Sequence, residues 1–193
     1  TKRGDFFLKL LVSNHTAADV NSRLHFVEFL RDGGLSVPSV IATKSGCRFA
    51  SVRADGQQRQ AVMSRWIDGD TLGPRARDRQ VERSGELLAR LHVRSQQYDP
   101  PDESKFRAWD DVYVTAENEW LNQFLSSSPV SETDKEILKR AANRTKRISA
   151  GLPRDRRNYG LIHADFHGDN LIFDGETIWI VDLDDVSWGH FLF

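Results

Sequence analysis

The stretch "LIHADFHGDNLIF", from Leu161 to Phe173, constrains the fold of this chain more than any other part of its sequence. Two histidines, two aspartates and an asparagine lie between short apolar runs, and the turn sequence "DGE" and the run "TIWIVDL" follow directly. Two apolar runs joined by a short turn that contains glycine predict a β-hairpin. The polar residues would then form a loop at one end of this hairpin.

One interpretation of this loop is a metal-dependent hydrolase. Alternate residues of an extended strand share a face, so His163, Asp165, His167 and Asp169 could together ligate zinc or manganese. No second histidine cluster completes such a site, because the remaining histidines are scattered singly along the chain: His15, His25, His92 and His190.

The other interpretation is phosphoryl transfer. In the protein-kinase catalytic loop, a histidine, any residue and an aspartate are followed by four residues and an asparagine; the aspartate accepts the proton of the substrate hydroxyl and the asparagine binds magnesium. His163, Asp165 and Asn170 match this spacing. A second metal-binding aspartate is needed at the end of the following hairpin, where Asp182 stands in "IVDLDD". One asparagine and one aspartate suit magnesium, which also binds phosphates and water.

A kinase also needs a lysine on a strand of its small lobe to hold the phosphates. Lys9 lies inside the apolar run "FFLKLL", where an unpaired ammonium group would be costly. Lys9 therefore has a functional partner, or it faces water from an edge strand, and the sequence leaves both alternatives open. Asp184 and Asp185 also have two interpretations, as charges near the site or as turn and cap residues.

The rest of the chain predicts a small sheet followed by helices. The strand "DFFLKLLV" precedes a helix from Thr16 to Arg31, which Gly33-Gly34 ends, and the strands "SVIAT", "CRFASV" and "QAVMSRWI" form an antiparallel meander. A hinge near Ser64 to Gly69 leads to helices between Arg77 and Ala150, with Gly85 as a close-packing point. Apolar stripes predicted at helical spacing include Val20, Leu24, Val27 and Leu30; Val81, Leu87, Leu88 and Leu91; Trp109, Val112, Tyr113, Ala116, Trp120 and Phe124; and Ile137, Leu138 and Ile148.

Composition excludes several classes of partner. The chain has 27 basic and 28 acidic residues, a net charge of -1, so no overall field attracts nucleic acid or an anionic membrane. The basic segment 135–157 lacks interleaved aromatic residues, which favours a solvated surface and leaves docking of an anionic substrate as the alternative. The single cysteine, Cys47, and the shortness of the apolar runs predict a cytoplasmic protein without disulfides or a membrane span.

Taken together, these motifs resemble the aminoglycoside phosphotransferase-like kinase family, which includes choline, homoserine and bacterial stress-response kinases, the last being the most similar branch. "FFLKLL" resembles the strand of the phosphate-binding lysine, "AVMSRWIDGDTL" the hinge, and "LLARLH" the first helix of the large lobe. "LIHADFHGDNLIF" with "IVDLDD" resembles the catalytic hairpin. The resemblance extends over nearly the whole chain.

The resemblance implies an α+β, protein-kinase-like fold with an antiparallel-sheet lobe at residues 1–66 and a mainly helical lobe at 67–193 that carries the catalytic hairpin. It also implies ATP and magnesium as cofactors, and transfer of the γ-phosphoryl group to a hydroxyl of a small molecule or protein. The roles carried over are Asp165 as catalytic base, Asn170 and Asp182 as magnesium ligands, Lys9 at the phosphates, and Met63, Ser64, Arg65 and Ile67 at the adenine.

Two departures from the family matter. Arg23 occupies the helix position where the family has a glutamate that pairs with the strand lysine, and Glu28 lies about 140° further around the helix. Lys9 would then lack an acidic partner from this helix. The chain also begins after the first strands of the family and ends before its acceptor-binding helices, so we expect a fragment. A pseudokinase-like module that binds nucleotide without turnover is therefore the main alternative to a kinase.

Overall fold

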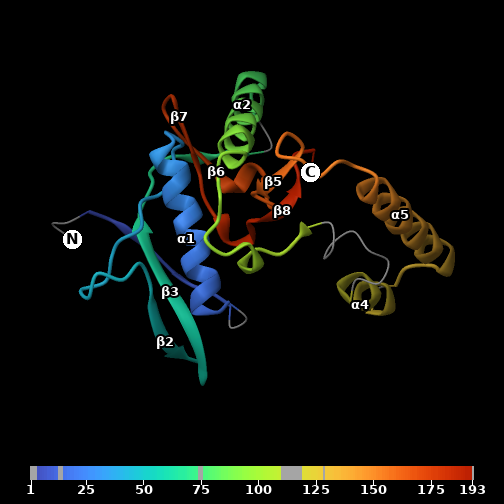
Figure 1. Ribbon diagram of the computed structural model, residues 1–193, viewed down its shortest axis with the longest axis horizontal. Helices are drawn as coiled ribbons and strands as arrows, with labels where there is room; N and C mark the ends of the chain where they lie inside the picture. The colour runs from blue at the N-terminus through green and yellow to red at the C-terminus, as the bar shows by residue number, and fades with distance from the viewer. Residues whose placement is uncertain (1–3, 13–14, 74–75, 110–118, 128, 193) are drawn as a thin grey trace.

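An antiparallel sheet and one helix form the N-terminal part of the computed structural model, which describes residues 4–12, 15–73, 76–109, 119–127 and 129–192 (Figure 1). The strands β1 (Phe6–Leu10), β2 (Ala50–Ala54) and β3 (Gln57–Arg65) pair in the order β1-β3-β2. The predicted strand "SVIAT" is wrong, because only an isolated bridge joins Val40 to Ser64. Val40 and β2 lie against the same edge of β3, and β2 pairs with residues 57–61 of it. Only a short contact with the segment around Val40 remains.

Helix α1 (Ala17–Asp32) begins where the sequence predicts. Thr16 caps it by accepting a hydrogen bond from the amide of Asp19, whose carboxylate in turn accepts one from the Thr16 amide at 3.0 Å. Gly34 ends the helix with a left-handed φ of +82°. Phe26 is fully buried although it lies off the predicted stripe, because Tyr98 packs on that second side with a ring-centroid distance of 5.0 Å. The predicted stripe itself is confirmed as buried: Val20, Leu24, Val27 and Leu30.

The helical part contains α2 (Asp78–Ser95), α4 (Glu119–Ser127) and α5 (Glu132–Ala150). Leu87 and Leu91 of α2 are buried, whereas Val81, in its first turn, is 54% exposed. The close-packing role expected of Gly85 is wrong, since a Cβ there would meet no atom within 4 Å. Among the described residues, no helix has both the length and the apolar composition to cross a membrane.

Helices α4 and α5 extend to one side of the molecule, away from α1 and α2 (Figure 1). Val112, Tyr113 and Ala116, from the predicted stripe before α4, lie outside the described residues. The predicted stripe of α5 stays exposed because this helix lies beside the main core and not over it, whereas α4 buries Leu125, which is 4% exposed. The stripe residues that remain exposed are Phe124, Ile137, Leu138 and Ile148.

The predicted hairpin is confirmed as β6 (Leu171–Asp174) and β7 (Thr177–Ile180), joined at Gly175 with a φ of +56°. Strand β4 (Asp70–Thr71) adds to β6, so the segment after the hinge lies against the hairpin. A separate pair joins β5 (Tyr159–Ile162) to β8 (Ser187–His190), and the sequence did not predict β8. The expected lobe boundary at residues 66 and 67 falls between β3 and β4; the division into two lobes stays a prediction.

One buried core holds the elements that carry the polar loops. It joins Leu30 of α1 and Leu91 of α2 to Leu161 of β5 and Ile180 of β7, each of which is at most 1% exposed. Burial of a side chain of this size stabilises the folded state by about 1.5–3 kcal/mol. The two helices are therefore held against the strands on either side of the loop 163–170.

The buried His92 of α2 should make the stability of the folded chain depend on pH. It stacks on Phe191 with a ring-centroid distance of 4.7 Å, and burial lowers its pKa from 6.5 to about 4. The unfolded chain therefore takes up a proton below pH 6.5 that the folded chain does not, so this contribution to stability is lost as the pH falls toward about 4.

Chemical denaturation across this pH range measures the effect. We expect the free energy of unfolding to fall with pH in the natural protein, and less steeply in His92→Phe, which keeps a ring on Phe191 but cannot titrate. An unchanged slope in His92→Phe would contradict this assignment.

Candidate active site

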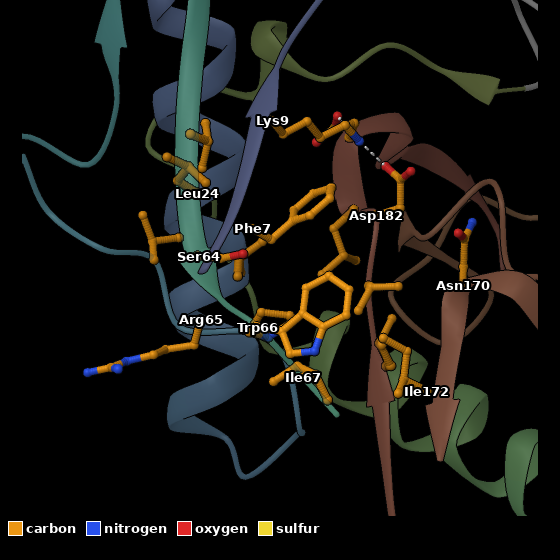
Figure 2. A pocket seen from close by; sticks show the side chains of 18 of the residues that line it. Phe7, Lys9, Leu24, Ser64, Arg65, Trp66, Ile67, Asn170, Ile172 and Asp182 are labelled. Atoms are coloured by element: carbon orange, nitrogen blue, oxygen red, sulfur yellow. Dashed lines mark hydrogen bonds and ion pairs between the residues drawn. The ribbon is translucent and has the colours of Figure 1, made fainter. Parts of the chain in front are cut away.

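A cavity of about 420 Å³ lies between the N-terminal sheet, α1 and the β6–β7 hairpin. Figure 2 shows Lys9 and Asp182 meeting at one end, with Trp66 and Ile67 at the other. The walls between these ends are mostly apolar, and the side chains that form them include Phe7, Leu11, Leu24, Val40, Val62, Ile172 and Leu183. The cavity thus combines a mostly apolar region with a charged end.

Lys9 bridges two carboxylates at this charged end. Its Nζ lies 2.6 Å from Asp182 Oδ1 and 2.6 Å from Asp184 Oδ2. Burial alone would lower the pKa of Lys9, but hydrogen bonds and charge from the two aspartates outweigh it and raise the pKa. Lys9 does have an acidic partner, although β1 is an edge strand.

The partner of Lys9 comes from the hairpin and not from α1. Glu28 of α1 instead binds Arg48, with 2.7 Å between Glu28 Oε2 and Arg48 Nη2. Asp184, for which the sequence left a turn role and a charged role open, therefore contributes charge to the site. An acid two residues after Asp182 could have been found from sequence by requiring a carboxylate partner for the lysine within the run "FFLKLL".

Asp165 and Asn170 are brought together by the loop between β5 and β6. Asn170 Nδ2 donates to the backbone oxygen of Asp165 at 2.8 Å and to its Oδ2 at 3.0 Å. Because Nδ2 is engaged in this way, Oδ1 is the atom that Asn170 can offer to a cation. Asn170 is 7% exposed, whereas the side chain of Asp165 is 49% exposed and accessible to a substrate.

His163 braces this loop against the end of β7. The Asp165 amide donates to His163 Nδ1 at 3.3 Å, so the ring must carry its proton on Nε2, which donates to the Val181 oxygen at 3.0 Å. Burial of the ring lowers the pKa of His163, consistent with a neutral imidazole. These two contacts fix the loop against the end of β7.

The same contacts do not support a zinc or manganese site. His163 is buried and uses both nitrogens within the loop, while His167 is half-exposed and lies 3.3 Å from Asp165. Among the described residues, no group of three or more histidine, cysteine, aspartate or glutamate side chains could hold a metal ion. The alternating pattern does not form a shared ligand face, because the loop turns at Ala164, where φ is +64°.

Ser64, Arg65 and Ile67 line the apolar part of the cavity, as expected for an adenine site, but Met63 does not. Side chains alternate along β3, so Met63 lies on the opposite face from Val62 and Ser64. Arg65 contributes its backbone, since its side chain points away from the cavity (Figure 2). Its amide donates to the Ser39 oxygen at 3.0 Å.

Trp66 was missed by the sequence analysis, although it is the largest side chain at the apolar end (Figure 2). Its amide donates to the Asp5 oxygen at 3.2 Å, and its indole nitrogen donates to Asp68 Oδ1 at 3.1 Å. An aromatic residue directly after a strand that ends at a hinge is a signal that could have identified it. A flat indole here suits stacking against a planar ring.

A second cavity, of about 370 Å³, opens on the other side of the loop. Asp165 lines it, but the first cavity does not include Asp165. The catalytic candidate therefore faces one cavity while the metal-binding candidates face the other. The remaining lining residues are Leu88, His92, Trp109, Ile162, His163, Ala164, Phe166 and His167.

The model of the phosphotransferase enzyme family matches residues 1–193 of the chain. The chain belongs to this family. A comparison with curated proteins gives no significant match. The finer placement beside the bacterial stress-response kinases stays a prediction.

Solved structures of kinases share the fold. An amicoumacin kinase in complex with AMP-PNP and Ca²⁺ superposes with a TM-score of 0.78 at 20% identity, over 97% of this chain and 54% of its own. A microcompartment-associated aminopropanol kinase gives 0.82 at 24% identity, over 95% and 59%. A choline/ethanolamine kinase family protein from Mesorhizobium loti gives 0.57 at 19% identity, over 98% and 55%. The α+β kinase-like fold is thereby confirmed, and the chain spans somewhat more than half the length of these proteins.

Close packing at Gly168 predicts that the loop does not tolerate a side chain there. The Leu72 amide donates to the Gly168 oxygen at 3.1 Å, and a Cβ at Gly168 would overlap the Leu72 carbonyl. We expect Gly168→Ala to cost about 1–3 kcal/mol, measured by urea denaturation. Gly85→Ala is the control, since a Cβ there meets nothing within 4 Å; equal stabilities of the two variants would contradict the packing argument.

Proposed function

We propose that this chain is the core of an ATP- and magnesium-dependent phosphotransferase that moves the γ-phosphoryl group to a hydroxyl. The observation that carries the proposal is the convergence of Lys9, Asp182 and Asn170 at one end of the apolar cavity, with Asp165 bonded to Asn170 on the far side of the loop. Family membership supports the reaction class.

The residues at the charged end fit a magnesium ion and the phosphates of ATP. Asn170 Oδ1 and the carboxylate of Asp182 are hard oxygen ligands of the kind that magnesium prefers. Lys9 Nζ already occupies a position between two carboxylates, which indicates that a cation is stable there. The bound ion would neutralise charge on the phosphates.

The chain's own residues would orient the reacting groups. The apolar walls and Trp66 hold the adenine, and Lys9 offsets charge on the phosphates. Asp165 accepts the proton of the acceptor hydroxyl and aligns it for attack, while the contact from Asn170 Nδ2 fixes the direction of the Asp165 carboxylate. His163 keeps the loop at a constant position relative to Val181 and hence to Asp182.

The acceptor in this proposal is a small molecule. The cavity beside Asp165 has a volume of about 370 Å³, which suits a compact ligand with an apolar part against Trp109 and Phe166. The structural neighbours named for their substrates, an amicoumacin kinase and an aminopropanol kinase, take small molecules that support the same class. A protein acceptor has no comparable support.

A pseudokinase-like module is the second candidate. Its support is the ion pair between Lys9 and Asp182. The proposed phosphate-binding lysine and the proposed metal ligand bind each other in this structure. In a kinase, Lys9 and Asp182 would have to exchange this contact for the phosphates and the metal ion. A module that binds nucleotide weakly and never turns over would tolerate such a pair.

The Asp165→Asn variant distinguishes the two candidates. We expect it to lower the rate of phosphoryl transfer from ATP by about 10²–10⁴-fold, because the general base is lost, while ATP affinity stays within a few-fold. The measurement is ADP release in the presence of a panel of small amino alcohols and sugars. Asp169→Asn, in the same loop with an 81% exposed side chain, should keep its activity.

An equal activity of Asp165→Asn and the natural protein would contradict the role of Asp165. Absence of turnover in the natural protein, combined with measurable ATP binding, would favour the pseudokinase-like module.

The Asp182→Asn variant tests the metal site separately. We expect it to lose most of the gain in ATP affinity that magnesium provides, because the carboxylate ligand is removed. Calorimetric titration with ATP, with and without magnesium, measures this gain. Asp174→Asn, at the far turn of the hairpin, is the control. A gain that is the same in all three proteins would exclude Asp182 as a ligand.

A further inference from the structure

Arg23 places a second cation in the wall of the first cavity. It lies on α1, is half-buried, and lines the cavity together with Lys9, Asp182 and Asp184. Burial lowers the pKa of Arg23, and the nearby charges of Asp184, Asp19 and Asp185 act in the opposite direction. A guanidinium keeps its charge in such surroundings, so Arg23 is a desolvated cation at this site.

The hydrogen-bonding capacity of Arg23 is only partly used. One terminal nitrogen contacts His15 Nδ1, which must accept because a guanidinium has only donors, so His15 is neutral and holds one edge of the group. Arg23 Nε is buried and has no acceptor among the residues that the structure describes. Within the same residues, Arg23 forms no ion pair, and the cavity carboxylates Asp182 and Asp184 bind Lys9. A buried donor without an acceptor destabilises the protein unless a ligand supplies one.

The ligand chemistry follows from these unmet donors. A planar guanidinium binds anions that present two or more oxygens, and phosphate groups meet this requirement. Lys9 is divided between two aspartates and would compensate only part of the charge of a triphosphate. Arg23 feels the charge of nearby aspartates but makes no direct ion pair with a carboxylate of the described residues, so its donors remain open to an anion.

We propose that Arg23 binds the phosphate chain of the nucleotide, beside Lys9. This inference rests on the proposed nucleotide site in the same cavity. In this proposal α1 contributes Arg23 as a phosphate contact. The acidic partners of Lys9 come from the turn after β7 instead of from α1.

Calorimetric titrations with magnesium-ATP and with adenosine test the proposal. We expect Arg23→Gln to weaken ATP binding by at least about tenfold, the effect of losing one charge-assisted hydrogen bond, and to leave adenosine binding unchanged. Arg23→Lys should show a smaller loss for ATP, because it keeps the charge but not the planar donors. The control is Arg31→Gln on the same helix, where Arg31 Nε lies 3.8 Å from Asp32 and the residue does not line the cavity.

Three outcomes would overturn the proposal. Unchanged ATP affinity in Arg23→Gln would show that Arg23 does not contact phosphate, whereas equal losses for ATP and adenosine would assign it a merely structural role through His15. If the natural protein binds neither compound, the nucleotide site itself fails, and the proposal fails with it. Thermal unfolding shows whether Arg23→Gln is folded; if it is not, Arg23→Lys must lose affinity for ATP and keep that for adenosine.

Discussion

The register of the β6–β7 hairpin is the constraint on which the candidate site depends. Leu171 pairs with Ile180, and the Val181 amide donates to the Asn170 oxygen at 3.0 Å, so the residues just outside the hairpin are neighbours. A shift of one residue would turn every side chain to the other face. Asn170 and Asp182 would then no longer face a common cavity. The buried Leu171 and Ile180 oppose such a shift, because it would expose them.

A second constraint is the pair of ion contacts that connects the hairpin to the small sheet. Lys9 belongs to β1, whereas Asp182 and Asp184 follow β7, so these ion pairs connect the two ends of the chain. These side chains are 31–43% exposed, so water screens the two ion pairs and their contribution to stability is modest. An ion pair that water screens in this way can be exchanged for another partner at low cost.

Strain lies at the same positions as the proposed chemistry. Ala164, beside Asp165, and Asp182 both have left-handed backbones, with φ of +64° and +59°, although neither is glycine. Such conformations persist only where the surrounding contacts determine them, here the brace from His163 to Val181 and the hydrogen bond from Val181 to Asn170. The loop and the turn after β7 are therefore held as one unit.

Local patterns in the sequence were sufficient for the elements that are stabilised by near neighbours. The capped helix α1, the hairpin turn and the spacing of Asp165 and Asn170 follow from residues a few positions apart. The exposed apolar stripes of α4 and α5, and the short contact in place of the "SVIAT" strand, did not follow. Whether a helix face is buried, or a segment pairs as a strand, depends on which distant element covers the helix or already occupies the strand edge.

The sequence by itself determined the family, the fold class and the order of the polar motifs, because short local patterns of residues identify each of them. Only the tertiary structure decided which charges meet. It paired Lys9 with two aspartates from the far end of the chain, paired Glu28 with Arg48, and left Arg23 without a carboxylate partner among the described residues. These contacts join residues that are distant in sequence, and a charged side chain pairs with the partner that the packing of strands and helices brings within reach.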